Sequence, residues 1–343
     1  MLMRFLPIAT LFILTFFSDF TNAQIKVDTL LSDAISIRAI AVDGNQVWYA
    51  ADKGRYGRID LAKRTRDKRK IFIDTMQIEF RSLAQTPAHV FIFKIGNPAL
   101  LYKISKTTLD EQLVYSEKNS GVFYDAMQFW NDREGIAIGD PTDGCLSMIV
   151  TRDGGHTWQK IGCDVLPATI EGEAAFAASN TNIAIQGDHT WVVSGGKKAR
   201  VFYSPDKGRT WTATDTPMVQ GGSMTGIFTV DFYDRQTGVI AGGDYENPQN
   251  NSANKAITHD GGKTWKLIGE NSGFGYASCI RFVPQSGGVK LLCVGATGIH
   301  LSSDGGGTWR KLSDDKDLYT IWFIDPVTAI AAGKNKLVRL TLP

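Results

Sequence analysis

The sequence predicts an all-β protein, a seven-bladed β-propeller, on three observations. A short motif ending in Thr-Trp occurs four times, and its closing residues Trp158, Trp211, Trp265 and Trp309 are 53, 54 and 44 residues apart. Short apolar segments with strand-like alternation fill the intervals in the same order each time. The last unit is one strand short, and the start of the chain could supply it. A recurrence of about 40 to 50 residues is typical of propellers and other repeat arrays.

The repeated motif has the chemistry of a tight hairpin turn. In TRDGGHTW, SPDKGRTW, THDGGKTW and SSDGGGTW, an Asp stands two residues after a hydroxyl residue and two before a glycine. Such an Asp accepts hydrogen bonds from the N–H groups ahead of it, and glycine adopts a positive φ without steric cost. The alternative, a four-carboxylate active site, is disfavoured because the copies belong to different blades and face outward. The pattern matches the Asp-box, or BNR, repeat of β-propellers, with structural residues Asp153, Trp158, Asp206, Trp211, Asp260, Trp265, Asp304 and Trp309.

The first 23 residues have the features of a secretory signal peptide. One cation, Arg4, precedes an apolar segment over 5–17, and Ala23 stands before the expected cleavage site at Gln24. No later segment approaches the roughly 18 apolar residues of a membrane-spanning helix. We therefore expect a cleaved leader over 1–23 and a single propeller domain over 24–343 that is secreted or periplasmic.

Composition narrows the class of protein further. The net charge of +2 is close to neutral, which argues against nucleic acid as the main partner. Thirty-five Gly and eleven Pro fit many tight hairpins better than disorder. No Ser/Gly-rich linker divides the chain, so we expect one domain. We also expect a monomer.

Each middle repeat contains an apolar first strand, a second strand ending in Gly, and two strands joined by the Asp-box turn. The third repeat has these strands at 123–130, 135–140, 145–151 and 157–162. The fifth repeat spans 226–269 and the sixth spans 276–312, in the same order. The fourth is more irregular and keeps strands at 173–179 and 182–188 before its hairpin. Two earlier repeats, 37–61 and 80–105, keep the strands and lose the Asp–Gly pair.

The seventh repeat is incomplete. Strands at 317–325, 328–334 and 336–342 are followed by the end of the chain. The alternating segment 24–31 stands before the first repeat and can complete this last blade. Pairing the two termini would close the ring and remove its open edges. Six or eight blades remain alternatives if one of the degenerate repeats is misassigned.

Four cysteines could form two disulfides in an exported protein. Cys145 and Cys163 flank the third hairpin and would lie opposite each other if Val150 pairs with Trp158. Cys279 and Cys293 face each other across the first two strands of the sixth repeat. Each pair is within reach only in the right register, and buried free thiols are an equally open alternative.

Motifs for a metal or a cofactor are not evident. His156 and His259 fall in hairpin turns and His300 falls in a strand, so the histidines do not form a metal site. The segment GFGYAS (273–278) has two glycines of a dinucleotide motif but no strand before it or helix after it. We therefore expect no cofactor and no metal.

Segments in a fixed order give the chain a family resemblance. FRSLAQ, FYDAMQFWNDREGIAIGDPTDG, EGEAAFAAS, GIFTVDF and YASCIRFV, with Asp-boxes between them, resemble exported bacterial propellers related to the photosystem II stability/assembly factor family. The resemblance covers residues 32–343 and implies a seven-bladed propeller. In plants and cyanobacteria this family acts as an assembly chaperone that holds a membrane-protein intermediate without catalysis. It therefore implies a non-enzymatic binding role, although the first two repeats depart from the pattern.

The expected binding site is one mouth of the central channel. In a propeller, the first strand of each blade lines the channel, so its leading residues ring one opening. Those residues are Arg38, Arg81, Asp125, Glu173, Tyr276 and Tyr319, and Asp140 and Asp244 could join them from loops. Guanidiniums, carboxylates and phenols that converge on a funnel suit a protein segment or a small polar ligand. The alternative is that these charges only neutralise one another along a wet channel.

A second functional class is an exo-acting glycoside hydrolase of the sialidase type, which also uses Asp-box propellers. The groups for such a site would be Arg38, Arg81, Arg281, Glu173, Tyr276 and Asp125. A FRIP-type stretch, which carries the first arginine in sialidases, is absent. Sialidases are also expected to have six blades, so this class ranks second.

A basic run over 63–70 contains six cations around Asp67. Such a run is usually a solvated hairpin tip. The functional alternative is a contact with anionic lipid or an acidic partner, which salt would weaken.

Overall fold

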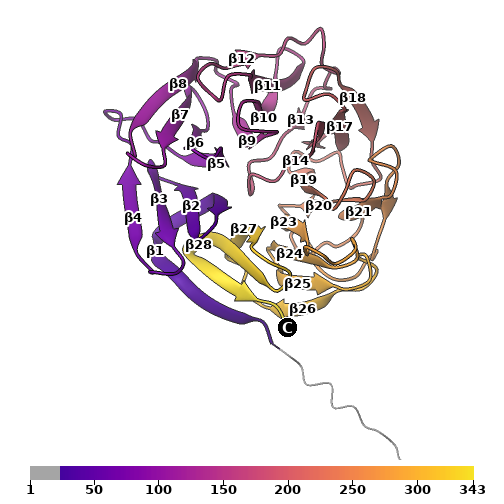
Figure 1. Ribbon diagram of the computed structural model, residues 1–343. Coiled ribbons are helices and arrows are strands. Elements are labelled where there is room, and N and C mark those ends of the chain that lie inside the picture. Colours follow the sequence, from indigo (N-terminus) through magenta and orange to yellow (C-terminus); the bar gives the residue numbers. More distant parts are fainter. Residues whose placement is uncertain (1–23) are drawn as a thin grey trace, which may run out of the picture.

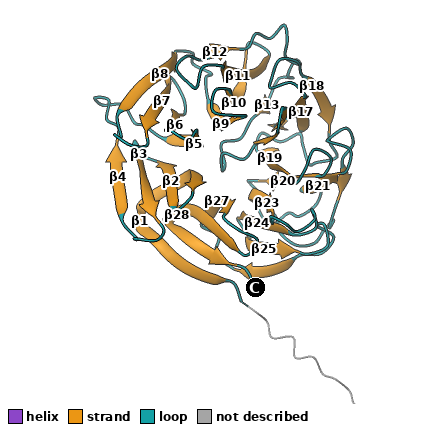
Figure 2. Ribbon diagram, in the orientation of Figure 1, coloured by secondary structure: helices purple, strands orange, loops and turns teal. Residues whose placement is uncertain are grey.

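Antiparallel strands make up the regular structure of the computed structural model, which describes residues 24–343. The strands form sheets arranged in a ring (Figure 1), and Figure 2 shows only strands and loops in this part of the chain. Within the same residues, no helix has the length and hydrophobicity needed to cross a bilayer. The signal peptide expected over 1–23 lies outside the described residues.

Four of the sheets have four strands each. In chain order, the first has β5 (Phe80–Gln85), β6 (His89–Lys94), β7 (Ala99–Ser105) and β8 (Glu111–Glu117), and the second has β9 (Tyr124–Phe129), β10 (Gly135–Thr142), β11 (Cys145–Thr151) and β12 (Gln159–Lys160). The third has β14 (Ile183–Gln186), β15 (His189–Val193), β17 (Arg200–Ser204) and β18 (Thr212–Asp215), and the fourth has β23 (Ala277–Phe282), β24 (Leu291–Gly295), β25 (Gly298–Ser302) and β26 (Arg310–Ser313).

Two larger sheets complete the ring. One has the order β13 (Glu173–Ala174), β16 (Gly195–Gly196), β19 (Thr225–Phe232), β20 (Gly238–Asp244), β21 (Lys255–Thr258) and β22 (Lys266–Leu267). The other has the order β27 (Leu318–Phe323), β28 (Thr328–Thr341), β1 (Lys26–Asp43), β2 (Gln46–Ala51), β3 (Arg55–Asp60) and β4 (Arg66–Lys70).

The described chain is therefore an all-β propeller of six hydrogen-bonded sheets, and the predicted count of seven blades is wrong. The reason is β1, which is continuous over 18 residues. Its first part pairs with β28, from Lys26 with Thr341 to Ser36 with Lys334. Its second part pairs with β2, from Ile37 with Ala51 to Asp43 with Gln46. The first and last repeats of the sequence are therefore joined in one six-stranded sheet.

The ring is closed where its two ends meet. β1 lies beside β28 in Figure 1, and the paired residues run in antiparallel register. The predicted use of an N-terminal strand to complete the last unit is confirmed. Because this pairing leaves no gap between the first and last strands, the ring has no open seam there.

Each Asp-box aspartate accepts hydrogen bonds from residues of its own turn and so stabilises that turn. The Oδ1 atom of Asp153 accepts hydrogen bonds from the N–H groups of His156 and Thr157, both at 3.0 Å. The Thr157 hydroxyl donates to Oδ2 at 2.7 Å, and the Thr151 hydroxyl donates to Oδ1 at 2.9 Å. Partial burial opposes the shift, but these hydrogen bonds lower the pKa of Asp153 to about 2. The equivalent contacts with the following threonine occur at Asp206, Asp260 and Asp304.

The tryptophans of these boxes pack between sheets. Trp158 contacts Phe91 of the preceding sheet with ring centroids 6.2 Å apart, and contacts Phe129 at 5.8 Å. Trp309 contacts Phe274 at 4.7 Å in an edge-to-face arrangement. Such pairs stabilise a seam by about 0.5–1.5 kcal/mol beyond the burial of their area.

The cysteines divide into one bonded pair and two free thiols. Cys145 and Cys163 form a disulfide across 18 residues of sequence, with Cα atoms 5.6 Å apart. Cys279 and Cys293 are free and buried. The second disulfide considered from the sequence is therefore not formed.

The fourth repeat differs from the predicted strand order. The sequence predicts its first strand over 173–179, but only β13 is a strand there, and it pairs with β16 in the sheet of the following repeat. The edge strand of the four-stranded sheet is instead β14, which the sequence assigned as second. Residues 175–181, named here the central segment, pass through the middle of the ring.

Hydrogen bonds tie the central segment to six strands. They join Arg38 to Ala178 O (3.0 Å), Asn180 to Leu83 O (2.7 Å), Met127 N to Asn180 (3.0 Å), Ser179 to Ser278 O (2.6 Å), Thr320 to Ser179 O (3.1 Å), and Thr181 to Thr229 (2.8 Å). These partners lie on β1, β5, β9, β23, β27 and β19. Because the strands belong to five sheets, the segment lies across the channel and separates its two ends.

Candidate functional site

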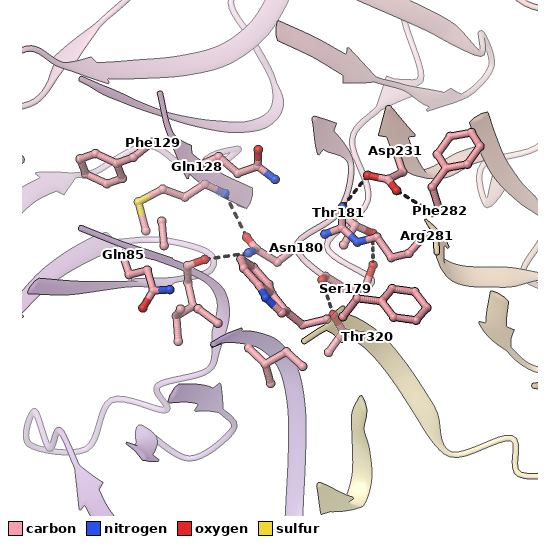
Figure 3. Close-up of a pocket in the computed structure, with 17 residues that line it drawn as sticks. Gln85, Gln128, Phe129, Ser179, Asn180, Thr181, Asp231, Arg281, Phe282 and Thr320 are labelled. Carbon is pink, nitrogen blue, oxygen red and sulfur yellow. Dashed lines mark hydrogen bonds and ion pairs between the residues drawn. The ribbon is translucent and has the colours of Figure 1, made fainter. Parts of the chain in front are cut away.

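The two ends of the channel carry different side chains. One end, named the arginine end, is formed where the innermost strands begin and contains Arg38, Arg81, Tyr276 and Tyr319. The other, named the pocket end, is formed where those strands finish and contains the pocket of Figure 3. The sequence predicts a site only at the first of these.

Arg38 at the arginine end is a guanidinium without a carboxylate partner among the described residues. Its Nη1 atom donates to Ala178 O at 3.0 Å, and its Cζ atom lies 4.4 Å from the ring centroid of Tyr319. Its Nε atom is buried and has no hydrogen-bond partner in the described part of the chain. Burial and the nearby Arg81 both lower the pKa of Arg38. These observations describe a positive group that has lost water without gaining an anion.

Arg81 supplies a second positive charge at the same end. Its Nε atom donates to Glu79 at 2.8 Å, and its guanidinium lies 5.9 Å from the ring centroid of Phe123. The Glu79 carboxylate forms an ion pair with Arg81 and also attracts Arg38 electrostatically at longer range, so two arginines share one carboxylate. Arg38, Arg81 and Glu79 together carry a net positive charge.

A row of aromatic rings reaches Arg38 through Tyr276. Phe176 of the central segment stacks on Phe228 with centroids 4.0 Å apart, and Phe228 meets Tyr276 edge-on at 4.8 Å. Tyr245 meets Tyr276 at 5.1 Å and is 51% exposed. Rings with one exposed polar tip are well suited to contact a peptide.

One buried and one half-buried carboxyl group complete the arginine end. Asp125 is fully buried, and neither of its carboxyl oxygens has a hydrogen-bond partner among the described residues, although the N–H groups of Asp140 and Ala177 act to lower its pKa. Burial and then Asp140 raise the pKa of Asp125 well above its usual value, against the effect of Arg81. Burial raises the pKa of Asp140 to about 6, although Ala175 N–H donates to it at 2.9 Å. The two carboxyls therefore retain a proton to higher pH than ordinary aspartates do. With a pKa of about 6, Asp140 is mostly ionised at neutral pH and offsets part of the arginine charge there.

Glu173 and Asp244 have other partners. Arg200 donates to Glu173 through Nε at 3.0 Å and through Nη2 at 2.6 Å, and Ser194 donates at 2.6 Å. Asp244 accepts two N–H groups of the turn that follows it, at 3.0 and 3.1 Å. The structure thus brings Arg38, Arg81, Asp125, Asp140, Tyr276 and Tyr319 together and leaves Glu173 and Asp244 in local structural contacts.

The pocket end contains a cavity of about 360 Å³. Its polar lining includes Gln85, Gln128, Ser179, Asn180, Asp231 and Arg281, all of which are labelled in Figure 3. The amides donate to backbone carbonyls, Gln85 to Val42 O at 2.8 Å and Gln128 to Ile183 O at 3.1 Å. None of the pocket-lining residues has a buried side-chain polar atom without a partner.

An ion pair neutralises the charge at the pocket end. Arg281 Nη1 donates to Asp231 at 3.0 Å, and Phe282 N–H donates to the other carboxylate oxygen at 2.7 Å. Burial raises the pKa of Asp231, and Arg281 opposes this shift. The pair is consistent with a structural role.

The sialidase-like arrangement is not assembled. Arg281 lies at the pocket end with Asp231, and Glu173 is bound to Arg200. A cluster of three arginines with Glu173 and Tyr276 is therefore not formed. In the described part of the chain, no group of three His, Cys, Asp or Glu could hold a metal ion.

Sequence reasoning missed the central segment and the pocket. The available signal was the composition of 173–182, EAAFAASNTN, which lacks the alternation of large apolar residues seen in the other first strands. Small residues allow a chain to cross a crowded channel. Hydroxyl and amide side chains can form hydrogen bonds with the surrounding strands on several sides. Only the ring geometry shows which strands they reach.

Comparisons with known proteins agree with the fold. The BNR/Asp-box repeat family matches residues 256–267. A search of curated proteins finds no significant match. The solved structure of YCF48 bound to D1 peptide is similar with a TM-score of 0.67 and 14% identity, over 94% of this chain and 97% of that one.

Other solved propellers are similar to about the same degree. YCF48 from Cyanidioschyzon merolae has a TM-score of 0.64 and 13% identity, over 94% of this chain and 99% of that one. The WD40 repeats of RRP9 have a TM-score of 0.62 and 11% identity, over 94% and 98% of the two chains. At these identities the similarity shows a shared propeller fold.

Proposed function

We propose that this propeller is a non-catalytic binding protein that holds a carboxylate-bearing segment of a protein partner at its arginine end. The observation that carries the proposal is Arg38, a largely buried guanidinium with an orphaned Nε and no carboxylate partner among the described residues. An anionic group from a partner would supply the hydrogen bonds and the charge that the chain itself does not provide.

Peptide is the class of ligand that the surroundings favour. Tyr245 and Tyr319 offer rings beside the guanidinium, and these can cover the apolar parts of a bound segment. YCF48, whose fold is similar, has been solved with a peptide bound. A carboxylate on such a segment, from Asp, Glu or a chain end, would lie between Arg38 and Arg81.

The proposed setting is outside the cytoplasm, secreted or periplasmic. The leader-like sequence of 1–23 supports this location. The disulfide between Cys145 and Cys163 also supports it, because such bonds persist in oxidising compartments.

The proposal can be tested by selecting random peptides on the immobilised chain, in parallel with its Arg38→Met variant. We expect the unchanged chain to enrich peptides with Asp, Glu or a free carboxyl end, and to bind them at least tenfold more tightly than the variant, since a charge-assisted contact contributes about 1.5–3 kcal/mol. Arg133→Met, at an exposed loop position, is the matched control and should bind like the unchanged chain. Selection without acidic enrichment, or equal binding by Arg38→Met, would contradict the proposal.

A further inference from the structure

The positive charge of the chain is concentrated at one edge of the ring. Residues 52–76 contain nine Lys or Arg and four Asp, a net charge of +5, whereas the whole chain has +2. The remainder of the chain is therefore negative overall. This edge is formed by β4, the last strand of the large sheet, and all five of its residues are exposed. Figure 1 shows β4 on the outer side of the ring, away from the channel.

Only some of these cations are neutralised. Arg58 pairs with Asp67 at 2.6 Å, Lys68 pairs with Asp33 at 2.8 Å, and Arg64 pairs with Asp28. In the described part of the chain, no ion pair joins a carboxylate to three further cations of the strand, Arg66, Arg69 and Lys70. These three charges are available to an outside partner.

An exposed phenyl ring lies two residues after the end of β4. Phe72 is 73% exposed, the most exposed of the large apolar side chains of the described region. The Lys70 amine lies 5.9 Å from its ring centroid. Next to it is a groove of about 630 Å³ between Lys53 and Lys70, with Ile71 and Ile78 in its lining. Cations beside a protruding ring are typical of segments that sit at a lipid interface.

We propose that the basic rim, residues 63–72, docks the propeller onto an anionic phospholipid surface, with Phe72 entering the interface. Each unpaired cation would be attracted to lipid phosphates, and the phenyl ring would leave water. Because the rim lies at the outer edge, docking there leaves both ends of the channel open.

A lipid surface fits this edge better than an added protein strand. Lysines and arginines along an edge strand are a common means of preventing another strand from pairing with it. A lipid surface needs no backbone pairing and no complementary shape, so it can accept a convex rim that carries one projecting ring. An acidic protein is the competing occupant, and the experiment below distinguishes the two.

The test is co-sedimentation of residues 24–343 with vesicles, which removes the apolar leader as a source of binding. We expect binding to vesicles with about one third phosphatidylglycerol and little binding to pure phosphatidylcholine. Raising salt from about 50 to about 500 mM should lower the bound fraction at least fivefold, because the Debye length shrinks. Equal binding to both vesicles, or binding insensitive to salt, would overturn the proposal.

Substitutions in the basic rim test whether these residues make the contact with the vesicle surface. Arg66→Gln, Arg69→Gln and Lys70→Gln together should weaken vesicle binding by on the order of 100-fold, and Phe72→Ser alone by on the order of tenfold. The matched control is Lys118→Gln, Lys263→Gln and Lys290→Gln together, which removes the same charge from exposed positions elsewhere and should bind within about threefold of the unchanged chain. Equal loss in both triple variants would show a bulk charge effect and contradict the assignment. Binding to poly-glutamate but not to the vesicles would assign the rim to an acidic protein instead.

Discussion

The two ends of the channel are built from similar residue types. They differ in whether the polar and charged groups of those residues have hydrogen-bond and ion-pair partners. At the pocket end, Arg281 has Asp231, and Asn180 bonds to two strands. At the arginine end, within residues 24–343, Arg38 has no carboxylate partner and neither carboxyl oxygen of Asp125 has a hydrogen-bond partner. Convergent polar groups in a cavity therefore do not by themselves mark a binding site. The unsatisfied end is the better candidate, because an unpaired buried polar group costs free energy that a ligand can recover.

The sharpest test of this comparison exchanges one arginine at each end for methionine. Arg281→Met leaves Asp231 buried without its partner, so we expect unfolding free energy to fall by roughly 2–4 kcal/mol. Arg38→Met removes a guanidinium that has no ion pair among the described residues and one hydrogen bond, to Ala178 O, so it should lower the unfolding free energy by only about 1 kcal/mol. Urea denaturation of both variants measures the difference. Equal losses would mean that Arg38 is structural too.

The next largest effect is expected in the central segment. Asn180→Ala removes the acceptor for Met127 N–H and the donor to Leu83 O, so we expect a loss of roughly 2–3 kcal/mol. Thermal unfolding followed by circular dichroism measures it. Asn45→Ala, on an exposed turn, is the control and should change stability by less than about 0.5 kcal/mol. A small effect of Asn180→Ala would show that the segment only fills the channel.

Because the carboxyl groups at the arginine end have raised pKa values, we expect the free energy of unfolding to depend on pH. The pKa of Asp140 is raised to about 6, so its contribution to stability is present at low pH and is lost as pH rises through about 6. Asn at this position resembles the protonated form of Asp140. The free energy of unfolding of Asp140→Asn, relative to that of the unchanged chain, should therefore rise by about 2 kcal/mol between about pH 4 and pH 8.

Urea denaturation across this range measures that gain. Asp153→Asn is the contrasting variant, because the pKa of Asp153 is lowered to about 2. Its stability relative to the unchanged chain should stay constant over the same range and change only below about pH 4. A flat difference for Asp140→Asn would show that this carboxyl is solvated.

The smallest expected effect concerns the exposed ring of the arginine end. Tyr245→Ser should weaken binding of the selected acidic peptides by about threefold and leave stability within about 0.5 kcal/mol, because the ring is half exposed. Phe72→Ser, an exposed ring on the basic rim, should leave peptide affinity unchanged. Fluorescence anisotropy measures both. Equal loss in the two variants would indicate a nonspecific contribution of exposed rings.

Much of the fold could be predicted because it depends on local chemistry. The Asp153 turn is closed by residues within four positions of the Asp, and the strands follow the alternation of apolar residues. The leading positions Arg38 and Arg81 were found by their place in the repeat, and they do lie at the same end of the channel. Glu173 was misplaced because the sequence cannot show that β13 pairs with β16 and leaves the next residues to cross the ring.

The sequence by itself determined the β-class, the self-closed turns and the pairing of the two termini, since each depends on neighbours in the chain or on a missing strand. Tertiary structure alone decided the number of sheets. The continuous strand β1 is hydrogen-bonded to β28 along its first part and to β2 along its second part, and so joins the two repeats in one sheet. It also decided which arginine is paired, since Asp231 and Arg281 are 50 residues apart and meet only when two strands lie side by side in the ring. Charge neutralisation depends on distances in space, so Arg38 and Arg281 look equivalent in sequence and differ in the folded chain.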